Sequence, residues 1–102
     1  MGKFNRTPTG VVLTGDAQQV AQGTTVIVYA ISLHAGTTAS SVLAVTGGAS
    51  GTTLYKLTHK AETVAGDNTD TVSFPEGLFF PDGLYLNLAG TDASVSVSYS
   101  TY

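Results

Sequence analysis

The sequence has no cysteine and no tryptophan among its 102 residues. Without cysteine, neither a disulfide nor a thiolate metal site can form, so packing and hydrogen bonding alone must hold the fold. The N-terminus lacks the apolar run of a signal peptide, and no stretch approaches the ~20 apolar residues that cross a bilayer. We therefore expect no membrane partner, and we expect synthesis in a cytoplasm.

Charge is also scarce. Charged residues make up 11% of the chain, and its cations are Lys3, Arg6, Lys56 and Lys60. Four cations in a chain of net charge −3 leave little with which to neutralise the phosphates of a duplex, so nucleic acid is not expected as a partner. A surface poor in charge lacks the repulsion that keeps monomers apart. The composition therefore favours stable contacts with other protein, including copies of the same chain.

The length allows one domain and no second core. We expect residues 1–9 to form an N-terminal arm and residues 10–102 to form a single β-sandwich domain. Such a short chain buries only about two-thirds of its unfolded surface, so association would add stability.

Helix-period signals are scarce, whereas β-branched and aromatic residues alternate with polar residues between glycine-rich turns. The spacing predicts an all-β fold, an antiparallel β-sandwich that is jelly-roll-like and has seven to eight strands, with a closed barrel as the alternative. The expected strands are 11–14, 24–34, 41–45, 53–58, 71–74, 84–88 and 94–99. Pro75 has no amide hydrogen for a ladder, so we expect the strand 71–74 to stop there.

The last two strands predict a hairpin. Residues 94–99 alternate serine with valine and tyrosine, which indicates one solvent face and one buried face. Residues 84–88 precede them across the turn 89–92, whose glycine and aspartate suit a hairpin. We therefore expect these two strands to pair.

The long strand 24–34 is apolar on both faces. Strict alternation points Val26 and Val28 to one side and Ile27, Tyr29, Ile31 and Leu33 to the other. The second face would be covered by the opposite sheet or by a neighbouring subunit. We assign Tyr29, Ile31 and Leu33 to an oligomer interface.

No arrangement of residues predicts catalysis, so we expect neither an enzyme nor a cofactor or metal. His34 and His59 are expected at a rim or in a loop, and a two-histidine metal site would require the fold to bring them together with an acid. Asp67 and Asp70 resemble part of a calcium loop, but the closing glutamate and the central glycine are missing. The glycine cluster 46–51 lacks the lysine and the helix of a phosphate loop, so a flexible turn is expected.

Three segments carry a resemblance. Residues 82–99 (DGLYLNLAGTDASVSVSY), preceded by 74–80 (FPEGLFF), look like the C-terminal half of small virion proteins of tailed bacteriophages. Residues 29–42 (YAISLHAGTTASSV) are similar to the opening strand and loop of the same group. Together these segments cover about two-fifths of the chain.

The resemblance implies a jelly-roll capsid decoration, or cement, protein on the outer surface of a phage head. Its partners would be the major capsid protein or other virion proteins, and a homotrimer is favoured. The arm would then bind the capsid, with Phe4 as an anchor and Lys3 and Arg6 meeting capsid carboxylates. A head, neck or tail fibre component remains the first alternative.

The second alternative is a receptor- or glycan-binding β module. Tyr55, Tyr85 and Tyr102 would then form a stacking surface for sugars, although the lack of tryptophan counts against a carbohydrate-binding face.

Overall fold

The computed structural model describes residues 9–101, which form eight β-strands and no helix. No helix in this range could therefore span a bilayer. The strands are β1 (Thr9–Leu13), β2 (Ala17–Val20), β3 (Val26–His34), β4 (Ser40–Thr46), β5 (Thr52–His59), β6 (Thr69–Phe80), β7 (Leu84–Ala89) and β8 (Ser94–Thr101).

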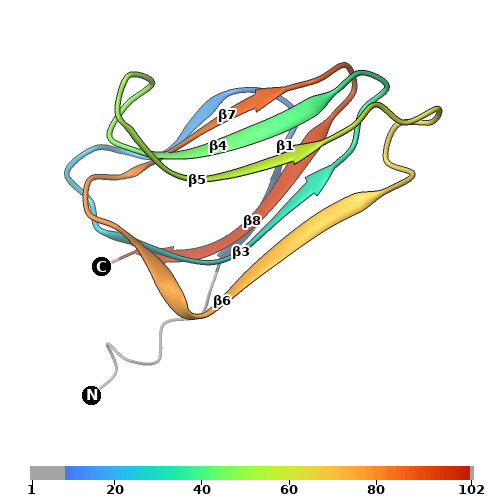
Figure 1. Cartoon of the computed structure of the whole chain (residues 1–102). Coiled ribbons are helices and arrows are strands. Elements are labelled where there is room, and N and C mark those ends of the chain that lie inside the picture. Colours follow the sequence, from blue (N-terminus) through green and yellow to red (C-terminus); the bar gives the residue numbers. More distant parts are fainter. Residues whose placement is uncertain (1–8, 102) are drawn as a thin grey trace.

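The strands form two antiparallel four-stranded sheets that pack face to face (Figure 1). Sheet A has the order β1-β8-β3-β6, and sheet B has the order β2-β7-β4-β5. The first strand pairs with the eighth, the second with the seventh, the third with the sixth and the fourth with the fifth. A long antiparallel hairpin of four strand pairs gives this order when it rolls up into two sheets, which is the jelly roll. The predicted all-β, jelly-roll-like sandwich is confirmed.

The core lies between the two sheets. Apolar side chains that are 0–2% exposed enter it from sheet A and from sheet B; the larger ones are Phe80, Ile31, Leu33, Leu84, Leu86, Val26, Val28, Val42 and Val95. Each fully buried side chain of this kind contributes about 1.5–3 kcal/mol relative to exposure to water. A cysteine-free chain of this size is thus held by one apolar layer shared by the two sheets.

The predicted C-terminal hairpin is wrong. Strand β7 belongs to sheet B, where it pairs with β2 and β4, and β8 belongs to sheet A, where it pairs with β1 and β3. The turn between them crosses from one sheet to the other. Alternation tells which side chains of a strand are buried, but it does not tell which strand is the neighbour.

The predicted orientation of the side chains of β3 is wrong beyond Val28. The register of β3 shifts between Val28 and Ala30 against both β6 and β8, so Tyr29 is an extra residue in a β-bulge. After the bulge, Ile31 and Leu33 point to the same side as Val26 and Val28 and are buried in the core. Strict alternation would have placed them on the outer face.

Two further differences occur at sheet edges. β6 continues through Pro75, because it is an edge strand of sheet A and a missing amide hydrogen costs no ladder bond on its open side. Ser73 pairs with Ala30 and Leu78 pairs with Val28, so residues 74–77 form a bulge opposite Tyr29. Strand β2, a four-residue edge strand that contains two glutamines, was not among the expected strands.

Candidate functional site

Small and hydroxyl-bearing side chains cover the outer face of sheet A. Cross-strand partners in an antiparallel sheet point to the same side, so the register assembles them into three rows. From β1 to β6 these rows are Gly10, Ser98, Ala30 and Ser73; then Val12, Ser96, Ser32 and Thr71; and then Ser94, His34 and Thr69, without a member from β1. We call this surface the hydroxyl face.

The described residues of these rows include no lysine, arginine, aspartate or glutamate. The side chain of Val12 is 65% exposed at one edge, and a shallow hollow of about 310 Å³ lies beside it, where Gly10 and Ala30 leave space. Phe79, which is 56% exposed, continues the same face beyond the β6 bulge because it pairs with the outward-facing Ile27. The rows therefore carry no acidic, lysine or arginine side chain and are partly apolar, with room for a protruding side chain.

Hydrogen bonds between side chains fix one end of the hydroxyl face. His34 lies 3.0 Å from Thr69 Oγ1 through Nδ1 and 2.8 Å from Ser96 Oγ through Nε2, and the hydroxyls of Ser32 and Thr71 are 2.9 Å apart. A base at this distance from a serine could take its proton. However, β8 lies between β1 and β3, so its backbone N–H groups serve the two ladders and offer no pair for an oxyanion. The contacts order the side chains at this end of the hydroxyl face.

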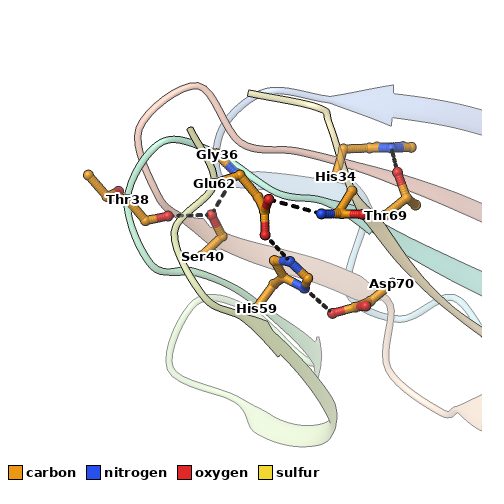
Figure 2. Close-up of polar contacts among 9 residues, drawn as sticks. His34, Gly36, Thr38, Ser40, His59, Glu62, Thr69 and Asp70 are labelled. Carbon is orange, nitrogen blue, oxygen red and sulfur yellow. Dashed lines mark hydrogen bonds and ion pairs between the residues drawn. The ribbon is translucent and has the colours of Figure 1, made fainter. Parts of the chain in front are cut away.

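A second polar cluster, the His59 cluster, joins the edge strands of the two sheets (Figure 2). It comprises His59 at the end of β5, Asp70 on β6, and Glu62 and Asn68 in the loop between these strands. His59 Nδ1 lies 2.7 Å from Asp70 Oδ2, and Nε2 lies 2.8 Å from Glu62 Oε2. Asn68 Nδ2 donates to Glu62 Oε1 at 2.9 Å.

The carboxylates set the charge of this cluster. The hydrogen bond with Asp70, followed by that with Glu62, raises the pKa of His59 above its ordinary value. In turn, the hydrogen bonds from His59 and then from Asn68 lower the pKa of Glu62. The side chains of His59 and Glu62 are only 16% and 12% exposed, so this ion pair is better shielded than a typical surface pair.

His34 bonds Thr69 and His59 bonds Asp70, and these consecutive residues of β6 point to opposite sides of sheet A, so the two histidines do not share a site. The carboxylate of Asp70, one of the two acids compared with a calcium loop, lies 2.7 Å from His59 Nδ1. Among residues 9–101, no group of three or more histidine and acidic side chains is arranged to hold a metal ion.

The glycine cluster 46–51 lines a hollow of about 570 Å³ at the end of β4. Its charged lining residue is Asp82, whose Oδ1 accepts from the N–H of Gly23 at 2.6 Å and whose carbonyl accepts from the N–H of Gly47 at 2.7 Å. A carboxylate repels phosphate, so the hollow does not suit an anion.

The predicted interface residues separate into two groups. Ile31 and Leu33 are 1% and 0% exposed, so their side chains belong to the core and cannot meet a partner. Tyr29 is half-buried at the bulge, where its hydroxyl lies 2.9 Å from Ser100 Oγ. The predicted capsid-binding residues Lys3, Phe4 and Arg6 lie outside the described residues.

Of the tyrosines proposed for sugar stacking, Tyr55 and Tyr85 do not share a face. Tyr55 pairs with the buried Ala44, packs against the core and contacts Phe74 edge-on with ring centroids 5.1 Å apart. Tyr85 neighbours Leu84 and Leu86, which are both buried, so it points to the outer side of sheet B. Tyr102 lies outside the described residues.

No known protein family matches the sequence, and no curated protein matches it. One solved structure, from a description of Bacillus endospore appendages as a novel family of disulfide-linked pili, is 18% identical. The alignment covers 95% of this chain and 92% of that chain with a TM-score of 0.39. The assignment of this chain to the jelly-roll class therefore rests on its own strand order.

Proposed function

We propose that this chain is a structural protein that acts by binding protein surfaces, including those of its own copies. The observation that carries the proposal is the hydroxyl face, whose rows lack charged side chains across all four strands of sheet A. Cores of protein interfaces are depleted in charge, and an uncharged face avoids setting like charges against each other when two copies meet.

We further propose that the chain is a capsid decoration protein of a tailed phage, bound to the outside of the head. Support comes from the resemblance in residues 29–42, 74–80 and 82–99 and from the jelly-roll topology, which viral capsid proteins use often. A protein that binds only the assembled shell stabilises it by its binding free energy, without performing chemistry.

Self-association is tested by placing a charge on the hydroxyl face. Ser98 lies on the central strand β8, between Gly10 and Ala30, so Ser98→Glu should introduce repulsion in the middle of the contact. In sedimentation velocity, we expect the wild type to be an oligomer, with a trimer favoured, and Ser98→Glu to be a monomer.

Thr58→Glu is the matched control, because Thr58 is exposed on β5 of the other sheet. This variant should associate like the wild type, and circular dichroism should show that both variants keep their β-structure. A wild type that stays monomeric, or Thr58→Glu dissociating as fully as Ser98→Glu, would contradict the proposed interface.

A further inference from the structure

The loop between β5 and β6, residues 60–68, is docked on the turn that follows β3. Ala35 donates its N–H to the carbonyl of Asn68 at 2.9 Å, and Gly66 donates to the carbonyl of Ala35 at 2.7 Å. The backbone N–H of Glu62 donates to the carbonyl of Gly36 at 3.0 Å. Three backbone hydrogen bonds thus hold the loop against one end of the sandwich.

The turn that receives the loop is itself fixed. A Cβ on Gly36 would lie 2.1 Å from the carbonyl oxygen of Thr91, so the backbones pack there without room for a side chain. The N–H of Gly36 donates to Ser40 Oγ, whose hydroxyl donates to the carbonyl of Thr38 (Figure 2). The N–H of Thr37 donates to the carbonyl of Thr91 at 2.9 Å. Any opening at this end is therefore expected in the loop rather than in the turn.

The contacts of His59 require a doubly protonated ring. Both ring nitrogens face carboxylate oxygens, at 2.7 Å and 2.8 Å, and an ionised carboxylate can only accept. A neutral imidazole has one N–H, so one nitrogen would set its lone pair against a carboxylate. The geometry fits only the imidazolium as long as Glu62 and Asp70 are ionised.

We propose that residues 60–68 form a flap whose closure on the turn after β3 is controlled by one proton on His59. The imidazolium connects Glu62, near the start of the flap, to Asp70 of β6, so it ties the flap to the edge strand of sheet A. Loss of the proton removes one of these contacts and leaves two nearby carboxylates without a compensating charge. This inference does not depend on the proposed function.

Other charges near the cluster belong to the same region of the chain. Lys60 in the flap helps to lower the pKa of Glu62, although less than the hydrogen bonds do. From β4, the residue paired with His59 is Ser40, which does not titrate. From β3, His34 bonds Thr69 and Ser96 rather than a member of the cluster. The titrating groups that face His59 are therefore Asp70 and Glu62.

The direction of the pH effect follows from these contacts. The pKa of His59 is raised, so its stabilisation is complete below the ordinary imidazole pKa of about 6.5 and is lost as pH rises through the raised value. The pKa of Glu62 is lowered, so its contribution is present above the ordinary value of about 4.3 and is lost as pH falls through the lowered value. The flap should be closed between the two folded-state pKa values and looser on either side.

Amide hydrogen exchange by NMR tests the flap directly. The amides of Glu62 and Gly66 report its closure, and the amide of Thr37 reports the neighbouring turn. After correction for intrinsic exchange rates, protection of the Glu62 and Gly66 amides should fall by up to about tenfold per pH unit above the pKa of His59, as expected for one linked proton. Protection of Thr37 should stay constant, and the ring nitrogens of His59 should both carry protons near neutral pH.

Glu62→Gln and His59→Gln should each lower the protection of the Gly66 amide at neutral pH and remove most of its pH dependence. Asp67→Asn is the matched control, since Asp67 lies in the same loop and bonds Val64 through its backbone N–H; it should behave like the wild type. Should His59→Gln fail to fold, Glu62→Gln and the wild-type titration still decide the result. Protection that does not vary with pH in the wild type, or a neutral His59 at pH 6, would overturn the proposal.

Discussion

At the scale of single residues, two glycines with the same backbone conformation differ in their surroundings. Gly66 has φ +81° and Gly83 has φ +80°, both in the left-handed region that favours glycine. A Cβ on Gly66 would meet nothing within 4 Å, whereas one on Gly83 would lie 2.6 Å from the carbonyl oxygen of Ala21 and 2.7 Å from that of Val20. Gly83 therefore favours glycine for two reasons, its left-handed backbone and the lack of space for a Cβ.

This difference predicts unequal costs for the same substitution. Gly66→Ala should lower the free energy of unfolding by about 1–2 kcal/mol, the cost of a left-handed alanine. Gly83→Ala should cost roughly 1–3 kcal/mol more, because overpacking adds to the same backbone strain. Urea unfolding followed by circular dichroism measures both, and equal costs would show that the Val20–Ala21 backbone shifts freely.

At the scale of strands, the bulge at Tyr29 decides what β3 contributes to the molecule. Without it, strict alternation would expose Ile31 and Leu33; with it, both enter the core between the sheets. The extra residue thus moves two large apolar side chains from a candidate interface to the interior.

Truncating these side chains should therefore affect stability rather than association. We expect Ile31→Ala and Leu33→Ala each to lower the free energy of unfolding by about 2–5 kcal/mol, as cavities in cores do. Val12→Ser, at a side chain that is 65% exposed, should change it by no more than about 0.5 kcal/mol. Urea unfolding distinguishes an inward Ile31 from an outward one. Truncating an outward Ile31 would change the free energy of unfolding as little as Val12→Ser does.

At the scale of the whole molecule, the jelly roll places β1 at the edge of sheet A, directly after residues 1–8 in the chain. The residues proposed to bind a capsid, Lys3, Phe4 and Arg6, all precede this strand. Removing them leaves every strand of both sheets in the chain, so binding and folding can be separated by experiment.

The truncated chain should keep its fold but lose its partner. Deleting residues 1–8 should leave the far-UV spectrum unchanged and abolish co-sedimentation with shells of the phage major capsid protein, whereas the wild type should co-sediment saturably. Equal binding by both chains would remove the arm from the proposal. Binding of neither chain to shells, together with signal on a glycan array, would favour the receptor-binding alternative.

Much of the fold could be predicted because alternation and turns are local properties. The strand at residues 94–99 and the turn in the glycine cluster 46–51 fall where the pattern puts them. The pairing of β7 with β2 and β4 could not be predicted, because every amphipathic strand offers the same backbone groups to its neighbour. The bulge at Tyr29 left no local signal, and Pro75 was misinterpreted because its cost depends on whether its strand lies at an edge.

The candidate sites were less predictable than the fold. The serines and threonines were visible in the sequence as a hydroxyl-rich composition, but only the register assembles them into rows on one side of sheet A. His59 and Asp70 are eleven residues apart and lie on edge strands of different sheets. Their meeting depends on the loop 60–68 and on the turn after β3, which no short motif records.

The sequence by itself determined that this protein is an all-β sandwich without disulfides and with little charge, because composition and period-two alternation act residue by residue. Only the tertiary structure decided which strands are neighbours, which face of β3 is buried and which carboxylates reach His59. These features depend on contacts between segments far apart in the chain, and their free energy arises only when both sheets close over a common core.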